Sequence, residues 1–320
     1  MGEDSEGLHD LADLDANRLR SPLPTMIDPR RYQPPLPLPG GLQRAQIVAS
    51  LERASIDGSQ GSELQCYARE DCDRFLYTLD LVPESAVDVL EVGANPYFTT
   101  ALLLNFRPRA RLHLVNYFGG EPGTAAQTLQ LPAFDGNGVQ SHRLEYLHAN
   151  LEAHRLPLPD RLLDVVLYCE VIEHLLNDPL ASLLELKRLL RPDGLLIVTT
   201  PNVARLENLA RMVAGANLYD PYSGYGPYGR HNREYTRHEL HRLLEFCGFT
   251  QEVFFSADVH DNRAGGYCDL SALQDLVAFR APDLGQYLFC RYRNTGAAPQ
   301  TRPGWLYRSY AQDQLDPTPL

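Results

Sequence analysis

The stretch of sequence that decides the fold is residues 87–106, VDVLEVGANPYFTTALLLNF. Its first seven residues, VDVLEVG, are rich in Val and Leu and predict a strand of a buried parallel sheet. The last nine residues, FTTALLLNF, fit a helix. Between them, Gly93 permits a tight turn and a close approach of a ligand to the backbone. This stretch therefore predicts a strand, a binding loop and a helix in direct succession.

The same alternation continues along the chain. Three further strands are predicted at RLHLVNY (111–117), LLDVVLYCE (162–170, the third strand) and LLIVTTP (195–201), with a helix at 179–194. Near-continuous apolar strands alternating with helices indicate an α/β fold, a Rossmann-like doubly wound, mostly parallel sheet. An antiparallel edge is predicted from residues 250–256 and 286–292, and further helices at 42–55, 63–80 and 236–249.

Composition divides the chain into three parts. Residues 1–45 form an acidic and then Pro-rich arm with seven prolines in 21–40, and we expect it to be irregular. Residues 46–292 form the main domain, and 293–320 a C-terminal extension. The Pro-rich arm is also a candidate contact for a protein partner.

Charge and composition narrow the function classes. The net charge of −12 disfavours nucleic acid and anionic membranes as partners and suits a neutral or cationic acceptor. We find no apolar run long enough to span a membrane and no secretory signal. Six cysteines without a CxxC pair are typical of reduced thiols, so we expect a cytoplasmic protein without a zinc site.

The segment VLEVGANPYFTT resembles the first motif of class I S-adenosylmethionine-dependent methyltransferases of the type 11/23 kind, and the similarity runs in order through most of residues 60–292. The resemblance implies that S-adenosylmethionine is the cofactor. The resemblance further implies that the methionine part of the cofactor contacts Glu91, Gly93 and Asn95. It implies that the ribose contacts Asn116, that the adenine contacts Asn150 and Leu151, and that Glu170 also lines the pocket.

Two of these positions depart from the family pattern. Asn116 and Asn150 stand where family members usually carry acids. An asparagine still donates and accepts hydrogen bonds but lacks the stronger charge-assisted bond to a hydroxyl. The loop also has a single glycine where a pyrophosphate site would want GxGxxG, which excludes a nicotinamide oxidoreductase.

The candidate catalytic residues are Glu173, His174 and His231. Glu170, Glu173 and His174 share one face if CEVIEHL begins a helical turn, and His231 lies in a loop after the strand at 195–201. Either histidine can act as a general base. The same set resembles the metal-assisted ubiquinone-pathway and small-RNA 2'-O-methyltransferases, but a divalent metal is an alternative that we do not expect, and we assign no metal ligand.

The sequence thus predicts a methyltransferase acting on an oxygen or nitrogen nucleophile of a small-molecule, saccharide or lipid-linked acceptor. Two alternatives stay open: a non-catalytic methyltransferase-like binding module, and metal-assisted methylation of an RNA 2'-hydroxyl. The loop at 217–236 contains five tyrosines among Gly and Pro residues and is a candidate lid or acceptor pocket.

Overall fold

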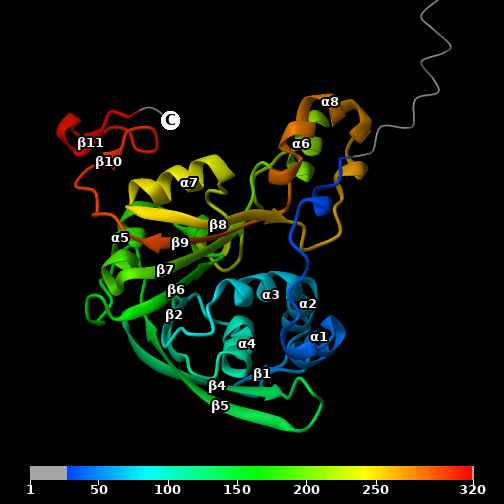
Figure 1. The fold of residues 1–320 in the computed structure, drawn as a ribbon, viewed down its shortest axis with the longest axis vertical. Helices are drawn as coiled ribbons and strands as arrows, with labels where there is room; N and C mark the ends of the chain where they lie inside the picture. The colour runs from blue at the N-terminus through cyan, green and yellow to red at the C-terminus, as the bar shows by residue number, and fades with distance from the viewer. Residues whose placement is uncertain (1–26, 319–320) are drawn as a thin grey trace, which may run out of the picture.

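The computed structural model describes residues 27–318 and is built on one large twisted sheet (Figure 1). The nine strands lie in the order β1-β4-β5-β3-β2-β6-β7-β9-β8. Strands β5, β3, β2, β6 and β7 are parallel to one another. The strand bounds are β1 Ser55–Ile56, β2 Asp88–Val92, β3 Arg111–Asn116, β4 Gly123–Pro132, β5 Val139–His148, β6 Leu163–Cys169, β7 Leu190–Pro201, β8 Phe249–Ala257 and β9 Tyr287–Asn294.

One edge of the sheet has the predicted antiparallel pair. Strand β9 pairs antiparallel with both β7 and β8. The central strands are buried on both sides because successive residues of β7 face different cores: Leu196 and Val198 face one, and Ile197 faces the other. The predicted fold class, a doubly wound, mostly parallel α/β sheet with an antiparallel edge, is confirmed.

The other edge corrects the predicted strand order, in which 162–170 was the third strand. A long antiparallel hairpin, β4–β5, precedes it, with Gly123 opposite His148. The hairpin stands where a helix would otherwise cross between the parallel strands β3 and β5. Strand β5 is largely solvent-exposed, so its sequence lacks the continuous apolar run of the central strands.

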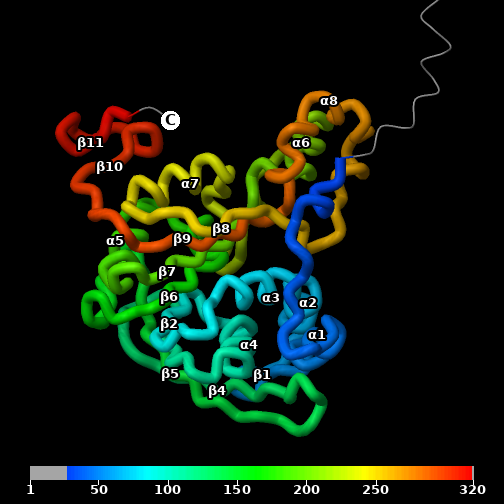
Figure 2. The backbone as a smooth tube through the Cα atoms, in the orientation of Figure 1, coloured from blue at the N-terminus to red at the C-terminus, as the bar shows by residue number. Residues whose placement is uncertain are grey.

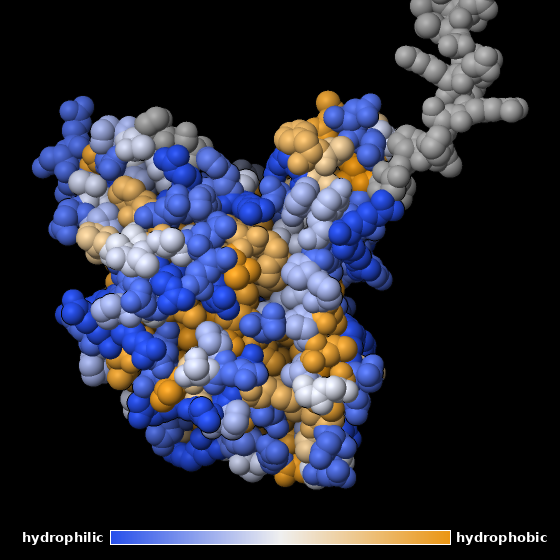
Figure 3. All heavy atoms as spheres, in the orientation of Figure 1, coloured by the Kyte–Doolittle hydropathy of each residue, from blue (hydrophilic) through white to orange (hydrophobic). Residues whose placement is uncertain are grey.

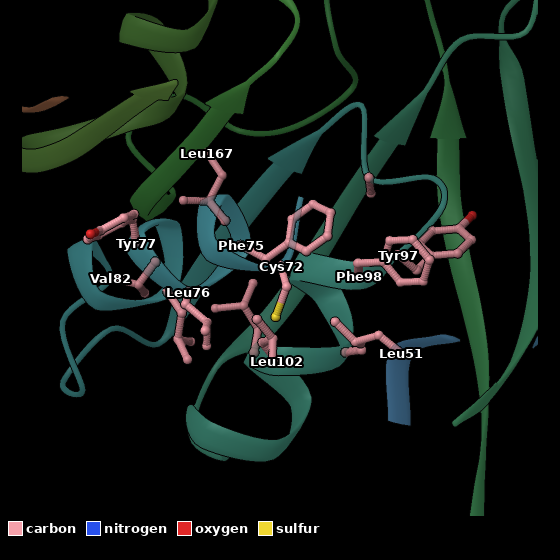
Figure 4. Close-up of a cluster of buried hydrophobic side chains, with 14 of the residues drawn as sticks. Leu51, Cys72, Phe75, Leu76, Tyr77, Val82, Tyr97, Phe98, Leu102 and Leu167 are labelled. Atoms are coloured by element: carbon pink, nitrogen blue, oxygen red, sulfur yellow. The ribbon is translucent and has the colours of Figure 1, made fainter. Parts of the chain in front are cut away.

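Helices cover both faces of the sheet. Helices α1 to α4 pack on one face in a core that includes Leu51, Phe75, Phe98 and Leu102 (Figure 4), and α5 and α7 pack on the other. The helix predicted at 63–80 is two helices, because Asp71 leaves the helical conformation between them and its carboxylate accepts a hydrogen bond from Arg74 Nε. The helix bounds are α1 Arg44–Glu52, α2 Ser62–Glu70, α3 Cys72–Leu81, α4 Phe98–Phe106, α5 Pro179–Leu189, α6 Leu206–Val213, α7 Arg237–Phe246 and α8 Gln274–Val277.

A small lobe and two peripheral segments complete the structure. Helix α6, α8 and the turns around them share a separate core with Ile27, and the chain that follows Ile27 runs from this lobe down to α1 (Figure 2). On the face shown in Figure 3, apolar residues gather in and below the notch beside this lobe. At the C-terminal end, β10 (Arg302–Pro303) pairs with β11 (Leu315–Asp316), and Tyr307 donates a hydrogen bond to Asp178 Oδ1.

The predicted arm lies partly outside the described residues, which begin at Ile27. Its described part contains only short 3-10 turns before α1. No helix among residues 27–318 is both long and apolar enough to cross a membrane.

Candidate functional site

The loop between β2 and α4 turns at Gly93, which has a positive φ of 72°. Its N–H donates to Val115 O at 2.8 Å, which ties the turn to β3. A Cβ at this position would lie 2.9 Å from Val171 Cγ2. Glycine is therefore required both by the backbone conformation and by the close approach of the turn that follows β6.

Asn116, at the end of β3, holds the same loop in place. The side chain is 2% exposed; its Oδ1 accepts from Asn95 N at 2.8 Å, and its Nδ2 donates to the Tyr97 hydroxyl at 3.0 Å. That hydroxyl donates to Gln127 Oε1 at 2.7 Å. The described structure thus uses both ends of the Asn116 amide to position the loop.

Asn150, after β5, repeats this arrangement with a different tyrosine. Its Nδ2 donates to the Tyr228 hydroxyl at 2.8 Å, and its Oδ1 accepts from Glu152 N at 2.9 Å. The Tyr228 hydroxyl donates to Glu152 Oε2 at 3.0 Å. Glu152 also accepts hydrogen bonds from the backbone N–H groups of residues 176–178, so one carboxylate joins three loops.

A cavity of about 180 Å³ lies where the carboxyl ends of β2, β3, β5 and β6 meet. Six of the predicted site residues line it: Gly93, Asn116, Asn150, Leu151, Glu170 and His174. The other lining residues are Val92, Val115, Tyr117, Ala149, Val171, Leu175 and Tyr228. In an open α/β sheet this is the edge where ligands bind.

Glu91 and Asn95 do not line this cavity. The Glu91 carboxyl accepts a hydrogen bond from the Thr100 hydroxyl at 2.5 Å and therefore points toward α4. Burial raises the pKa of Glu91 to about 8, so this carboxyl is mostly protonated at neutral pH. Asn95 instead directs its side-chain amide to Gln127.

The three predicted catalytic residues come together beside the cavity. Glu173, His174 and His231 each place one ligand-type atom within 4.8 Å of the others, and the two imidazole rings are 5.0 Å apart. Ile172–His174 forms a short 3-10 turn. Glu170 precedes this turn with a φ of 54°, so the predicted shared helical face does not form.

Glu173 is fully buried and only half satisfied. Its Oε2 accepts from the Thr200 hydroxyl at 3.0 Å, whereas its Oε1 has no hydrogen-bond partner among the described residues. Oε1 lies 3.9 Å from His174 Nε2. A buried carboxylate oxygen without a partner is costly, and its orientation here is toward the two histidines.

The two histidines are held differently. His174 Nδ1 is 3.0 Å from Arg230 O, and burial together with the nearby His231 lowers its pKa. His231 Nδ1 is 3.0 Å from Glu234 Oε1, and Glu234 is in turn paired with Arg205. Burial opposes the charged form of His231, but the hydrogen bond to Glu234 and the charge of Glu173 outweigh it and raise the pKa. Among the described residues, each imidazole therefore keeps Nε2 without a hydrogen-bond partner.

Glu170 faces the cavity with a buried cation behind it. Its Oε1 accepts from the Thr199 hydroxyl at 2.9 Å and lies 3.9 Å from Arg74 NH1. Burial raises the pKa of Glu170, and Arg74 opposes that shift. A cationic group in the cavity would favour the ionised form of Glu170 in the same way as Arg74 does.

Comparison with known proteins identifies the family of the central part of the chain. Residues 90–198 match the family model described as a methyltransferase domain. Residues 90–198 thus carry a methyltransferase domain, and for this part of the chain the predicted family is confirmed.

Relatives of this methyltransferase domain include two curated bacterial proteins. A malonyl-[acyl-carrier protein] O-methyltransferase of Laribacter hongkongensis is 30% identical over 172 residues, covering 54% of this chain and 56% of the relative. A probable S-adenosylmethionine-dependent methyltransferase of Mycolicibacterium smegmatis is 36% identical over 142 residues, covering 42% of this chain and 49% of the relative. The chain thus spans about half the length of each.

Among solved structures, a 1,6-didemethyltoxoflavin-N1-methyltransferase of Burkholderia thailandensis aligns with a TM-score of 0.39 and 19% identity. The alignment covers 66% of this chain and 71% of that one.

Several residues of the candidate site were not predicted. Gln127 lies on the hairpin strand β4, whose existence the sequence did not indicate. Tyr117 directly follows the predicted position Asn116, and its ring is 5.5 Å from that of Tyr228. A search for acids within three residues of His231 would have found Glu234. The remaining residues in this group are Glu152, Tyr228 and Arg205.

Proposed function

We propose that this protein transfers a methyl group from S-adenosylmethionine to an oxygen or nitrogen nucleophile of a small-molecule, saccharide or lipid-linked acceptor. The observation that carries the proposal is the cavity at the carboxyl ends of the parallel strands, formed by the Gly93 turn, both asparagines and Glu170. The catalytic cluster lies directly beside it, since His174 belongs to both.

The cavity offers suitable chemistry for each part of the cofactor. Glu170, backed by Arg74, faces the methionine end, where the cofactor carries its positive charges. Tyr117 and Leu151 supply the apolar walls that an adenine ring needs. The first curated relative is named an O-methyltransferase, which favours an oxygen acceptor.

Methyl transfer is a single displacement in which the S–CH₃ bond breaks as the new bond to the acceptor forms. A hydroxyl acceptor must also lose its proton, and a group near the acceptor has to receive it. His231 is suited to that role because Glu234 holds Nδ1 and leaves Nε2 free. Glu234 also stabilises the imidazolium that results.

A divalent metal at Glu173, His174 and His231 is a second candidate for the same step. The fit rests on the unpartnered Glu173 Oε1 and on both histidines directing Nδ1 to protein acceptors, the usual support for metal-bound imidazoles. When bound, such a metal would lower the pKa of an acceptor hydroxyl.

The first experiment is calorimetric titration of the full chain with S-adenosylhomocysteine, with magnesium, with manganese and with a chelator. We expect micromolar binding. No binding under any condition would overturn the cofactor assignment and favour a non-catalytic module.

A second experiment measures release of S-adenosylhomocysteine over a panel of hydroxyl, carboxylate and amine acceptors. With a responsive acceptor, His231→Gln should reduce turnover by about 100-fold or more. The exposed His238 provides a matched control, so His238→Gln should retain turnover. Unchanged turnover in His231→Gln would remove His231 from the mechanism, and loss of turnover with chelator would favour the metal.

A further inference from the structure

The cofactor cavity is roofed by one residue of the Tyr-rich loop. Of the tyrosines between residues 217 and 228, three are exposed to solvent: Tyr219 (86%), Tyr222 (92%) and Tyr225 (81%). Tyr228 differs from them because its ring lines the cavity and its hydroxyl bonds to Asn150 and Glu152. These two hydrogen bonds attach the loop to the wall that follows β5.

The cavity measures about 180 Å³, and the Tyr228 ring is one of its walls. A wall that moves outward enlarges the cavity, and its return closes the cavity over a bound ligand. The walls from β2, β3 and β6 belong to the central sheet, which leaves the surface loop as the wall most easily moved.

The second half of the loop folds compactly on itself, and we therefore expect it to move as one piece. A Cβ at Gly229 would lie 2.5 Å from Ser223 Oγ, so residues 223–229 fold compactly on themselves. Gly226 within this segment has a φ of 80° and a ψ of −169°, a conformation that is essentially restricted to glycine.

The same segment carries the catalytic histidine. Arg230 O lies 3.0 Å from His174 Nδ1, and Asn232 N donates to Glu173 O at 2.8 Å. The Asn232 side chain bridges His174 O and Pro227 O, both at 2.9 Å. Movement of residues 227–230 therefore disturbs the contacts that place His231 beside Glu173 and His174.

We propose that residues 217–231 form a lid over the cofactor pocket, that Tyr228 is its latch, and that closure positions His231 for catalysis. The inference rests on the proposed function, since it takes the occupant to be S-adenosylmethionine. Closure over the cofactor then precedes reaction, so the cofactor binds before a productive acceptor does. Tyr228 is a positioning residue: it acts on the reaction through the loop that it fastens.

The test compares Tyr228→Phe with Tyr225→Phe in the full chain. Both variants lose one hydroxyl from the same loop and keep the ring, but only Tyr228 has hydroxyl bonds to the pocket wall. Dissociation of S-adenosylhomocysteine, measured by surface plasmon resonance, should be about 10-fold faster in Tyr228→Phe, because one of the two lost bonds is to a carboxylate. Tyr225→Phe should stay within about twofold of the wild type on the same grounds.

Hydrogen exchange tests the link to His231. In the wild type, S-adenosylhomocysteine should slow exchange of the Asn232 and Arg233 amides, which bond to Glu173 O, and Tyr228→Phe should weaken that protection. Equal dissociation rates in the two variants would overturn the latch. Faster release without any ligand effect on these amides would overturn the coupling to His231. A wild type that binds no S-adenosylhomocysteine would overturn the proposed function itself, and the lid with it.

Discussion

Replacing Asn116 with aspartate restores the acid that family members usually carry at this position, and the structure predicts that it is harmful. The Asn116 side chain is 2% exposed and makes one bond in each direction, accepting from Asn95 N and donating to the Tyr97 hydroxyl. The Tyr97 proton is already given to Gln127. Because an ionised aspartate has no donor, its second oxygen would face the oxygen of Tyr97.

The size of the effect follows from these contacts. Leaving a buried polar group without its partner costs about 1–3 kcal/mol, and a buried carboxylate beside another oxygen belongs at the upper end. We expect the free energy of unfolding of Asn116→Asp to fall by about 2–3 kcal/mol, measured by urea unfolding at pH 7. Affinity for S-adenosylhomocysteine, measured by calorimetry, should not increase.

Tyr97→Phe provides the control for this reasoning. It removes the oxygen that the aspartate would face, so Asn116→Asp should cost about 1 kcal/mol less in the Tyr97→Phe background than in the wild type. Additive costs in this double-mutant cycle, or an Asn116→Asp protein as stable as the wild type, would refute the argument. Tenfold tighter ligand binding would instead assign the position to the ribose.

Three further predictions concern groups around the cavity. The pKa of Glu91 is about 8 when folded, above its value of about 4.3 in an unfolded chain, so the folded state keeps a proton that the unfolded state loses between these values. The free energy of unfolding should therefore fall as the pH rises from about 4.5 to 8. Glu91→Gln should reduce the difference between the free energies of unfolding measured with urea at pH 5 and at pH 8. An unchanged difference would contradict the buried, protonated carboxyl. Glu152→Gln places an amide N–H group against backbone N–H donors, so it should lower the free energy of unfolding by about 2 kcal/mol. A negligible change would count against the role of Glu152 in joining the three loops. Gly93→Ala should lower the free energy of unfolding by about 1–2 kcal/mol because of the positive φ, and by a further amount because the new Cβ clashes with Val171. Adding Val171→Ala should recover only the part that is due to the clash. If Val171→Ala recovers no stability, the clash is refuted.

The sequence predicted best the elements that are buried on both sides. Helix α4 begins and ends at the predicted residues, and strands β2 and β6 fall within the predicted ranges. Strand β7 covers the predicted 195–201 but begins at Leu190, so the predicted helix at 179–194 ends early, at Leu189. The apolar runs of these strands are long because both faces of each strand contact helices. Such a strand can therefore be recognised from its own residues, without knowing which strands lie beside it. The prediction of parallel strands also explains why one cavity is lined by Gly93, Asn116, Asn150 and Glu170, since parallel strands end at one edge of the sheet.

The elements that escaped prediction depend on contacts across the chain. Strand β5 alternates in burial and reads as a polar segment until β4 is known to lie beside it. The break at Asp71 depends on the conformation of one residue and its bond to Arg74, which leave no periodic signal. Tyr228 could not be separated from the other tyrosines of its loop, because only the folded chain shows which hydroxyl reaches Asn150.

The two asparagines acquire a common explanation once these contacts are known. Asn116 donates to Tyr97, which donates to Gln127; Asn150 donates to Tyr228, which donates to Glu152. In each relay as the structure has it, the first residue is a donor because the tyrosine proton goes to the acceptor that follows, and an ionised acid has no proton to give. An acid at either position therefore requires a different partner for the tyrosine. The missing acids reflect how this chain holds its loops together and do not by themselves indicate a lost site. Under the proposed function, we expect cofactor recognition to rest on the backbone turn at Gly93, on Glu170 and on the aromatic walls of the cavity.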